Sequence, residues 1–355
     1  MKQLVCLSHE PWSKNPGRTQ HLLSRLKDVQ ILWFQPAAGP LDRRWRAGGQ
    51  KVRQWVTVYT LPPARSMRQL FHPEAAFDAQ RQGRFVAEKM RRHRFRNAAL
   101  WCTDPRQVHL LEQLEYSRLI YDCHRDWSSL PIEWESQMTV QADVVFAASR
   151  ALAEYLSPCN LNVVLLPEGV NYAMFAQEFP PAERPGFCFV GSLYPDLDLA
   201  PLLYAARELP KCRFTVIGGV KDGGPPELDA LKKLRNVRLL GQRPELDLPE
   251  LLGQQQVYVN LLRDSEASTA IIPERMYEYL ATGKPIVSML WPEQVEELAD
   301  VIYGAHDERE FLSCCKQALA ESPGWVTDRR RSYAERSSWS ERAAAVQKIL
   351  DTLSG

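Results

Sequence analysis

The segment Thr269-Ala-Ile-Ile-Pro-Glu-Arg-Met-Tyr-Glu-Tyr-Leu-Ala-Thr-Gly-Lys-Pro-Ile-Val287 has the strongest local pattern in the chain. It predicts a loop, a helix, a glycine stop and a strand. Pro273 suits the start of a helix, where its missing N–H is not needed. Gly283 suits the position just past the helix end, and Pro285 prevents the helix from continuing. Residues 286–290 then read as a buried parallel strand.

The polar side chains of this helix point to an anion. Arg275 and Glu278 are three residues apart and therefore share a face. A cation in the first turn opposes the helix dipole, unless an anion binds where the free N–H groups point. We therefore expect Arg275 to bind a diphosphate and Glu278 to hold a ribose or sugar hydroxyl. An ordinary helix with a surface ion pair is the alternative interpretation.

The pattern Pro-x-(Lys/Arg)-x-x-Glu-Tyr-Leu-Ala-x-Gly-Lys-Pro-(Ile/Val)-Val resembles the donor-site helix of GT-B-fold glycosyltransferases. The nearest resemblance is to family 4-like enzymes of bacterial polysaccharide assembly, including the teichuronic-acid-type and xanthan glucuronosyltransferase groups. Many family 4 enzymes carry two glutamates eight residues apart; Glu278 matches the second, but Ala270 stands at the first. This departure leaves the retaining or inverting outcome open. The donor-binding residues implied by the resemblance and the local pattern are Gly191, Ser192, Arg243, Thr269, Arg275, Glu278 and Lys284.

Alternating strand and helix patterns on both sides of a proline-rich segment predict an α/β protein. The resemblance implies a GT-B fold, in which two Rossmann-like domains with parallel sheets face a central cleft. With 355 residues the chain has the length of two ordinary domains. We expect an acceptor-side domain at 1–178, a nucleotide-sugar-binding domain at 179–335, and a last helix at 336–355 that returns to the first domain.

The loop after the first predicted strand is rich in polar and aromatic residues. In parallel α/β sheets ligands bind at the carboxyl ends of the strands, so this loop is a candidate acceptor site. It also resembles the opening of the same family through Ser-His-Glu-x-Trp and Arg-x-Gln-His-Leu. The acceptor-side candidates are His9, Glu10, Trp12 and Arg18.

A second loop, after the strand predicted at 119–121, supplies the candidate catalytic residues. Asp122, His124 and Asp126 follow that strand, and the corresponding family segment borders the cleft. Transfer with inversion needs a group that takes the proton of the acceptor hydroxyl. Asp126 is the candidate base and His124 is its rival. A loop cap and a packing histidine are the structural alternative.

Charge is unevenly distributed along the chain. Residues 40–100 contain 14 Lys and Arg but 4 Asp and Glu, interspersed with aromatic residues. Such a surface suits an anionic membrane or a nucleic acid, and a solvated face is the structural alternative. No apolar run is long enough to span a bilayer, and the N-terminus lacks a signal-peptide pattern. The eight cysteines show no CxxC spacing, which favours reduced thiols. We expect a cytoplasmic protein at the inner face of the plasma membrane.

These observations predict a metal-independent glycosyltransferase of polysaccharide biosynthesis. Its co-substrate is a nucleoside-diphosphate sugar, its acceptor a glycan or lipid-linked glycan, and it has no other cofactor and no nucleic-acid partner. The absence of a GxGxxG motif argues against a nicotinamide or flavin enzyme. Two alternatives stay open: a nucleotide-sugar epimerase on the same fold, and a catalytically inactive subunit of glycan assembly. A crowded set of basic or acidic catalytic groups in the second domain would favour the epimerase.

Overall fold

The computed structural model describes residues 2–64, 73–179, 184–261, 271–289 and 298–353, with the side chains of 73–76 left aside. Its contacts divide the chain into two compact units. Unit 1 comprises Met1–Pro167 with Arg342–Gly355, and unit 2 comprises Glu168–Glu341. The proline-rich segment that predicts a boundary at 178 lies partly outside the described residues, so that boundary stays a prediction.

Unit 1 contains an eight-stranded sheet in which every neighbouring pair is parallel except the edge pair β3–β4. Parallel strands buried on both faces read as continuous apolar runs, as in the Val5–Leu7 part of the first strand. The order across the sheet is β3 (Gln50–Arg53), β4 (Val56–Thr60), β2 (Val29–Gln35), β1 (Lys2–Leu7), β5 (Ala99–Cys102), β6 (Arg118–Cys123), β7 (Val144–Ala147), β8 (Val163–Leu165).

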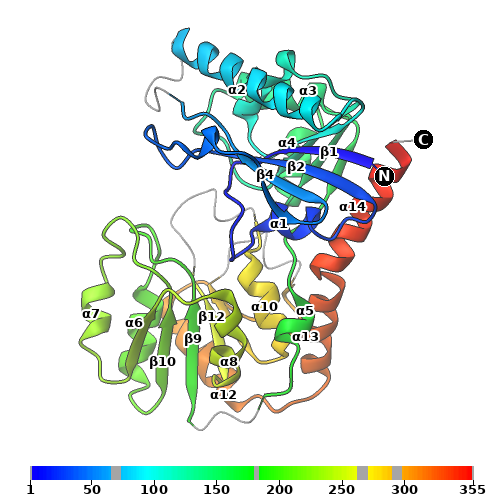
Figure 1. Ribbon diagram of the computed structural model, residues 1–355. Helices are drawn as coiled ribbons and strands as arrows, with labels where there is room; N and C mark the ends of the chain where they lie inside the picture. Colours follow the sequence, from blue (N-terminus) through cyan, green and yellow to red (C-terminus); the bar gives the residue numbers. More distant parts are fainter. Residues whose placement is uncertain (1, 65–72, 180–183, 262–270, 290–297, 354–355) are drawn as a thin grey trace. The chain divides into compact units, whose positions relative to one another are not determined.

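Helices cover both faces of this sheet (Figure 1). The two long N-terminal helices, α2 and α3, lie on one face, and α1 lies on the other together with the end of α14. Lys2 of β1 donates a hydrogen bond to the Leu350 carbonyl of α14, so the two ends of the chain meet in this unit. The helical elements are α1 (Arg18–Leu23), η1 (Arg44–Arg46), α2 (Pro73–Arg92), η2 (Pro105–Gln113), α3 (Ile132–Gln141), α4 (Arg150–Leu156) and α14 (Trp339–Leu353).

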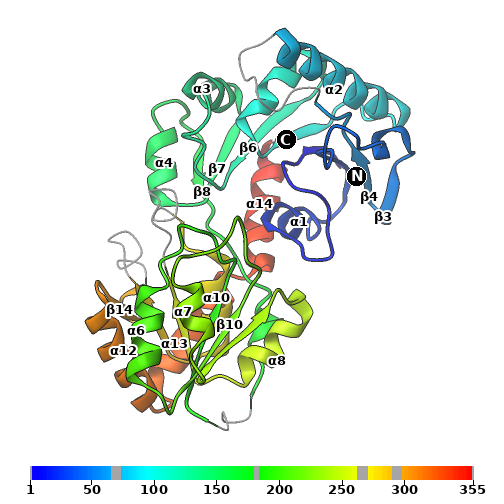
Figure 2. The same ribbon diagram turned by 90° about the vertical axis from the view of Figure 1, so that its left-hand side faces the viewer.

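Unit 2 contains a fully parallel six-stranded sheet (Figure 2). Its order is β11 (Val237–Gly241), β10 (Arg213–Ile217), β9 (Gly186–Val190), β12 (Val257–Asn260), β13 (Ile286–Met289), β14 (Tyr303–Ala305). One core cluster packs α6, α7 and α12 on one face, and a second packs α8, α10 and α13 on the other. The helical elements are α5 (Tyr172–Phe175), α6 (Ala200–Glu208), α7 (Leu228–Lys232), η3 (Glu245–Asp247), α8 (Leu248–Gly253), α10 (Glu274–Thr282), α12 (Glu308–Ala320) and α13 (Trp325–Arg336).

The predicted α/β class with parallel sheets is confirmed, and so is the local pattern of the quoted segment. Helix α10 begins directly after Pro273 and ends at Gly283, whose φ of 78° is the left-handed conformation that favours glycine. Strand β13 follows at Ile286. Among the described residues, no helix is long and apolar enough to cross a membrane.

Candidate active site

Helix α10 starts at the carboxyl edge of the second sheet, where a parallel sheet binds its ligands. Its position is set by two tyrosines. The Val190 backbone N–H, at the end of β9, donates to the Tyr279 hydroxyl at 2.8 Å. The Tyr279 ring also stacks on Tyr258 of β12, with centroids 4.6 Å apart. Because both contacts are buried, the first turn of α10 is held rigidly against the strand ends.

That first turn has the features of an anion site. No side chain of the described residues caps it, since its N-cap is Pro273. Helix α12 is different, because Asp307 accepts hydrogen bonds from the Arg309 and Glu310 N–H groups. The N-terminal end of α10 thus lacks a side-chain cap from the described residues and lies beside the guanidinium of Arg275, an arrangement that suits an anion.

Arg275 and Glu278 form the ion pair that their spacing predicts. The Arg275 side chain is 27% exposed and the Glu278 side chain 4% exposed. A buried carboxylate thus holds a partly accessible guanidinium at the helix start. Any diphosphate bound here shares Arg275 with Glu278.

The glycine turns after β9 and β10 also lie at this edge. A Cβ on Gly218 would lie 1.8 Å from the Gly191 carbonyl oxygen, so only glycine lets the two turns touch. Ser192 is exposed next to Gly191, and Arg243 is exposed beyond the end of β11. Thr269 lies outside the described residues. The structure therefore places Gly191 and Ser192 at the same sheet edge as Arg275.

Lys284 does not join this group. It precedes β13, at the amino edge of the sheet, and its ammonium donates to the Gly253 and Gln255 carbonyls at 2.6 and 2.7 Å. Burial lowers the pKa of Lys284 to about 8. The ammonium group of Lys284 therefore satisfies backbone carbonyls near the C-terminal end of α8.

A carboxyl group that the sequence did not single out lies in the first turn of α10. Glu274 accepts a hydrogen bond from the Trp339 indole Nε1–H at 3.0 Å. Burial and the nearby carboxylate of Glu168 raise the pKa of Glu274 to about 8, with a further contribution from Glu245. The sequence did not indicate a role for Glu274, because Trp339, Glu168 and Glu245 are all distant from it along the chain.

In unit 1 the structure brings together the ends of three adjacent strands, β1, β5 and β6. His9 Nδ1 lies 2.9 Å from Thr103 Oγ1, and the His9 backbone N–H donates to the same oxygen. The rings of His9 and His124 have centroids 4.8 Å apart, and Trp127 meets His9 edge-on. The loops after β1 and β6 thus form one polar cluster, which the strand order brings together.

Glu10 gives this cluster a fixed negative charge. His9 Nε2 and Arg125 Nη2 lie 3.3 and 3.7 Å from the Glu10 carboxylate. The hydrogen bond from His9, together with the nearby His124 and Arg125, lowers the pKa of Glu10 to about 2. Glu10 is therefore ionised at neutral pH and can accept hydrogen bonds from hydroxyl groups.

The other two acceptor-side candidates lie differently. Trp12 is partly buried, with its ring edge-on to Trp33 at 5.2 Å. Arg18 is buried: it pairs with Asp122 at 3.0 Å and donates to the Leu166 carbonyl at 2.7 Å. The guanidinium therefore ties α1 to the end of β6 and to the segment after β8, beneath the surface of the cluster.

The two candidate bases differ in what their side chains already contact. Both carboxylate oxygens of the exposed Asp126 accept hydrogen bonds from Ser128, through its backbone N–H and its hydroxyl at 2.7 Å. His124 Nδ1 lies 3.1 Å from the Asp122 carbonyl oxygen, which requires the proton on Nδ1 and leaves the lone pair on Nε2. Burial, His9 and Arg18 lower the pKa of His124 well below its ordinary value. His124 is therefore neutral, with Nδ1 donating to a backbone carbonyl and Nε2 without a partner among the described residues.

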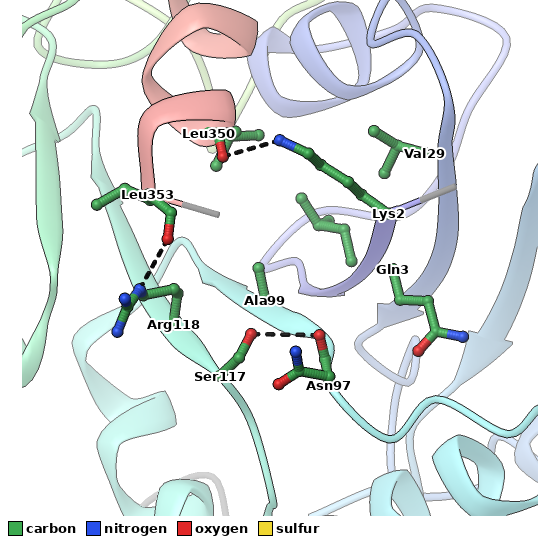
Figure 3. Close-up of a pocket in the computed structure, with 10 residues that line it drawn as sticks. Lys2, Gln3, Val29, Asn97, Ala99, Ser117, Arg118, Leu350 and Leu353 are labelled. Carbon is green, nitrogen blue, oxygen red and sulfur yellow. Dashed lines mark hydrogen bonds between the residues drawn. The ribbon is translucent and has the colours of Figure 1, made fainter. Parts of the chain in front are cut away.

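A cavity of about 560 Å³ opens at the opposite, amino edge of the first sheet (Figure 3). Lys2 and Arg118, the first residues of β1 and β6, donate from this cavity to the Leu350 and Leu353 carbonyls of α14. These two side chains bond backbone carbonyls at the C-terminal end of α14. Because the cavity lies at the opposite edge of the sheet, it is separate from the cluster around His9. Among the described residues, no group of three His, Cys, Asp or Glu is placed to hold a metal ion.

Comparison with known proteins identifies relatives in sequence and in structure. A family model described as glycosyl transferase-like matches residues 200–347. The chain is 23% identical, over 273 residues and 68% of each chain, to TuaH of Bacillus subtilis strain 168, named as a candidate teichuronic acid biosynthesis glycosyltransferase. Its predicted resemblance to this group is confirmed.

Solved structures match the chain over nearly its whole length. Sucrose-phosphate synthase from Thermosynechococcus elongatus has a TM-score of 0.77 at 14% identity, with 99% of each chain covered. An E. coli trehalose-6-phosphate structure bound with UDP-2-fluoro glucose has a TM-score of 0.74 at 14% identity, again covering 99% of each chain. Anabaena HepE, in complex with UDP and glucose, has a TM-score of 0.68 at 13% identity over 99% of this chain and 100% of its own. At these identities the likeness concerns the fold, and it confirms the predicted GT-B fold.

Proposed function

We propose that this chain, a glycosyltransferase with the GT-B fold, moves a sugar from a nucleoside-diphosphate sugar to a glycan or lipid-linked acceptor. The proposed donor site rests on one observation: Arg275 lies in the first turn of α10, which no side chain of the described residues caps. In the proposed reaction, Arg275 and the N-terminal end of α10 stabilise the leaving diphosphate. In our proposal no metal ion takes part in this step.

The donor nucleotide we favour is UDP. Two solved structures with the same fold are described as complexes with UDP-2-fluoro glucose and with UDP and glucose. In our proposal Gly191 and Ser192 approach the diphosphate, and Glu278 binds a hydroxyl of the ribose or the sugar. Arg243 and Thr269 remain candidates for contacts to the nucleoside.

We place the acceptor site in unit 1. We propose that His124 Nε2 accepts the proton of the acceptor hydroxyl, because its lone pair is free, whereas Asp126 already accepts two hydrogen bonds from Ser128. Glu10 and Trp12 would contact the acceptor, and His9 holds Glu10 in place. This assignment gives Asp126 the role of shaping the loop after β6.

A basic surface of unit 1 supports an acceptor at a membrane. We define the basic edge as the exposed cations of η1, β3 and the end of α2. It packs as one surface, since Trp45 of η1 meets Phe85 of α2 with ring centroids 6.5 Å apart. Leu41, beside η1, is 91% exposed. We propose that this edge binds anionic lipid headgroups through Arg43, Arg44, Arg46, Lys51, Arg53, Arg91, Arg92, Arg94 and Arg96.

An assay for donor turnover tests the proposal. The purified protein is incubated with UDP-, GDP- and ADP-sugars and with lipid-linked glycan acceptors, and the release of nucleoside diphosphate is measured. We expect one nucleotide to be preferred and release to require an acceptor. If no nucleotide sugar is turned over or bound, the glycosyltransferase proposal is wrong and an inactive assembly subunit is favoured instead.

A nucleotide-sugar epimerase remains the second candidate because of one observation. Glu168, Glu245 and Glu274 lie near one another in unit 2, which is the kind of acidic set that such an enzyme would use. Analysis of the sugar product separates the two functions. An epimerised sugar formed without acceptor would identify the epimerase, and a new glycosidic bond would identify the transferase.

A further inference from the structure

Two segments of unit 2 that adjoin its boundaries are bonded to each other. Unit 2 begins at Glu168 and ends at Glu341. Just inside these limits, the Val170 N–H donates to the Ser337 carbonyl at 3.1 Å, and the Trp339 N–H donates to the Val170 carbonyl at 2.9 Å. We call Gly169, Val170, Ser337 and Trp339 the boundary clamp.

The clamp depends on a glycine. A Cβ on Gly169 would lie 2.7 Å from the Trp339 ring and 3.0 Å from the Ser337 carbonyl oxygen. Only glycine therefore lets the indole lie flat against the backbone. Trp339 is fully buried, and its indole N–H finds an acceptor within the protein.

That acceptor is Glu274, the first residue of α10. The Trp339 Nε1–H donates to Glu274 Oε1 at 3.0 Å, and the next residue along the helix is Arg275. The clamp is thus bonded to the turn in which we place the donor diphosphate. Glu168 and Glu245 also lie near the Glu274 carboxyl group, and both are acidic.

The charge of Glu274 matters for an anion bound beside it. Ionised, its carboxylate would oppose the positive field of Arg275 and of the helix N-terminus. Burial and the carboxylates of Glu168 and Glu245 disfavour ionisation, and Arg275 and the Trp339 N–H favour it, with the result that the pKa of Glu274 is about 8. At pH 7 the group is therefore mostly neutral, and the first turn of α10 keeps its positive charge.

We propose that Trp339 and Glu274 are positioning residues for the donor diphosphate, with the Trp339 N–H holding the Glu274 carboxyl group in the first turn beside Arg275. The inference rests on the proposed function, because it assumes that α10 binds a diphosphate. The boundary clamp would then contribute to donor affinity in addition to its role in the fold.

Calorimetric titration with UDP and with uridine, at pH 7 and pH 9, tests the inference. Trp339→Phe keeps the ring and removes the donor, so we expect UDP to bind about 2- to 10-fold more weakly at pH 7, as for one lost hydrogen bond. Uridine binding should not change. Trp101→Phe is the matched control: Trp101 is a buried tryptophan of unit 1 whose indole N–H has no hydrogen-bond partner among the described residues.

The second readout is the pH dependence of UDP affinity in Glu274→Gln. A residue with a purely structural role would not change this pH dependence. The amide accepts from Trp339 but cannot ionise, so its affinity at pH 7 should match that of the unsubstituted protein. In the unsubstituted protein we expect UDP affinity to fall roughly tenfold between pH 7 and pH 9, as a negative charge develops near the diphosphate. In Glu274→Gln this fall should be absent.

Two results would overturn the inference while leaving the proposed function intact. One is that Trp339→Phe, folded by circular dichroism, binds UDP as tightly as the unsubstituted protein. The other is that the fall between pH 7 and pH 9 persists in Glu274→Gln, which would assign it to a different titrating group. Failure of the proposed function looks different: the unsubstituted protein would bind no nucleoside diphosphate, and both ideas would be rejected.

Discussion

The guanidinium of Arg275 is ion-paired with the carboxylate of Glu278, one turn further along α10, and the carboxylate is almost completely buried. This pair orients the guanidinium before any ligand arrives, which lowers the entropy lost on binding. It also means that a bound diphosphate adds a second acceptor to Arg275 and does not replace the first. The following predictions separate these roles from one another and from a purely structural one.

Arg275→Ala should weaken nucleoside-diphosphate binding about 10- to 150-fold, the range for loss of a charge-assisted hydrogen bond. Binding of the free nucleoside should hardly change, because it has no phosphate. Calorimetric titration with UDP, GDP and ADP against their nucleosides measures both. Arg309→Ala is the matched control, since Arg309 is also the second residue of its helix, but that helix is capped by Asp307. Equal losses for nucleoside and diphosphate would mean that Arg275 only supports the fold.

Glu278→Gln keeps the shape of the side chain and removes its charge. If Glu278 contacts the sugar, UDP binding should be retained and binding of the intact UDP-sugar should fall several-fold, by the weakening of one hydrogen bond to a hydroxyl group. If Glu278 contacts the ribose, which both ligands carry, both should bind more weakly by the same factor. Parallel titrations with UDP and the UDP-sugar provide the comparison. Unchanged binding of both ligands would refute a contact from Glu278 to either group.

His124→Gln should lower kcat roughly 10²- to 10⁴-fold with little change in donor affinity, as expected for loss of a general base. Asp126→Asn should have a smaller effect, because an amide oxygen can still accept from the Ser128 N–H. Steady-state kinetics of both variants decides between them. If Asp126→Asn shows the large loss and His124→Gln turns over normally, the carboxylate is the base and the histidine is a packing residue.

The basic edge should bind vesicles that contain anionic lipid, and salt should weaken this binding. Each cation near such a surface contributes about 1 kcal/mol, so Arg43→Ala, Arg46→Ala and Lys51→Ala combined should weaken partitioning on the order of 100-fold. The control removes three exposed cations of unit 2, Lys232, Lys233 and Arg235. Co-sedimentation that ignores lipid charge, or that both triple variants lower equally, would refute a specific role for this edge.

His21 should make the protein less stable in mild acid. Burial, with the nearby Arg25 cation, lowers the pKa of His21 to about 3. Between that value and the ordinary pKa of about 6.5, the unfolded chain binds a proton that the folded chain excludes, so stability falls as pH falls through this window. Urea unfolding at pH 7 and pH 5 should show a loss of about 1–2 kcal/mol that is smaller in His21→Gln. His306→Gln, at an exposed histidine, should behave like the unsubstituted protein; equal slopes in all three would exclude His21 as the cause.

Local chemistry was enough to predict the elements around the central segment. Proline at a helix start and glycine at a helix end act within a few residues, so α10 and β13 were predicted almost to their ends. The regular alternation of strands and helices likewise predicted parallel sheets. It also placed the loops of His9 and of His124 at the carboxyl ends of strands, and the order of the strands in the sheet then brought the two rings together.

Helices with weaker patterns were not predicted. Helix α13 is predominantly polar, and its buried Arg330 satisfies the Val301 carbonyl and pairs with Glu321. A charged residue in a helix predicts exposure, and only the folded chain supplies partners that allow its burial.

The sequence by itself determined the class of the fold, the edge of each sheet that binds ligands and the i, i+3 pair of Arg275 and Glu278. Tertiary structure alone decided which of the candidate side chains remain available. Lys284 is engaged by the carbonyls near the end of α8, and Arg18 by Asp122. Trp339 reaches Glu274, which lies 65 positions earlier in the chain. The physical reason is that propensity, capping and periodicity act over one or two turns, whereas burial and hydrogen-bond partners depend on segments that meet only when the sheets form.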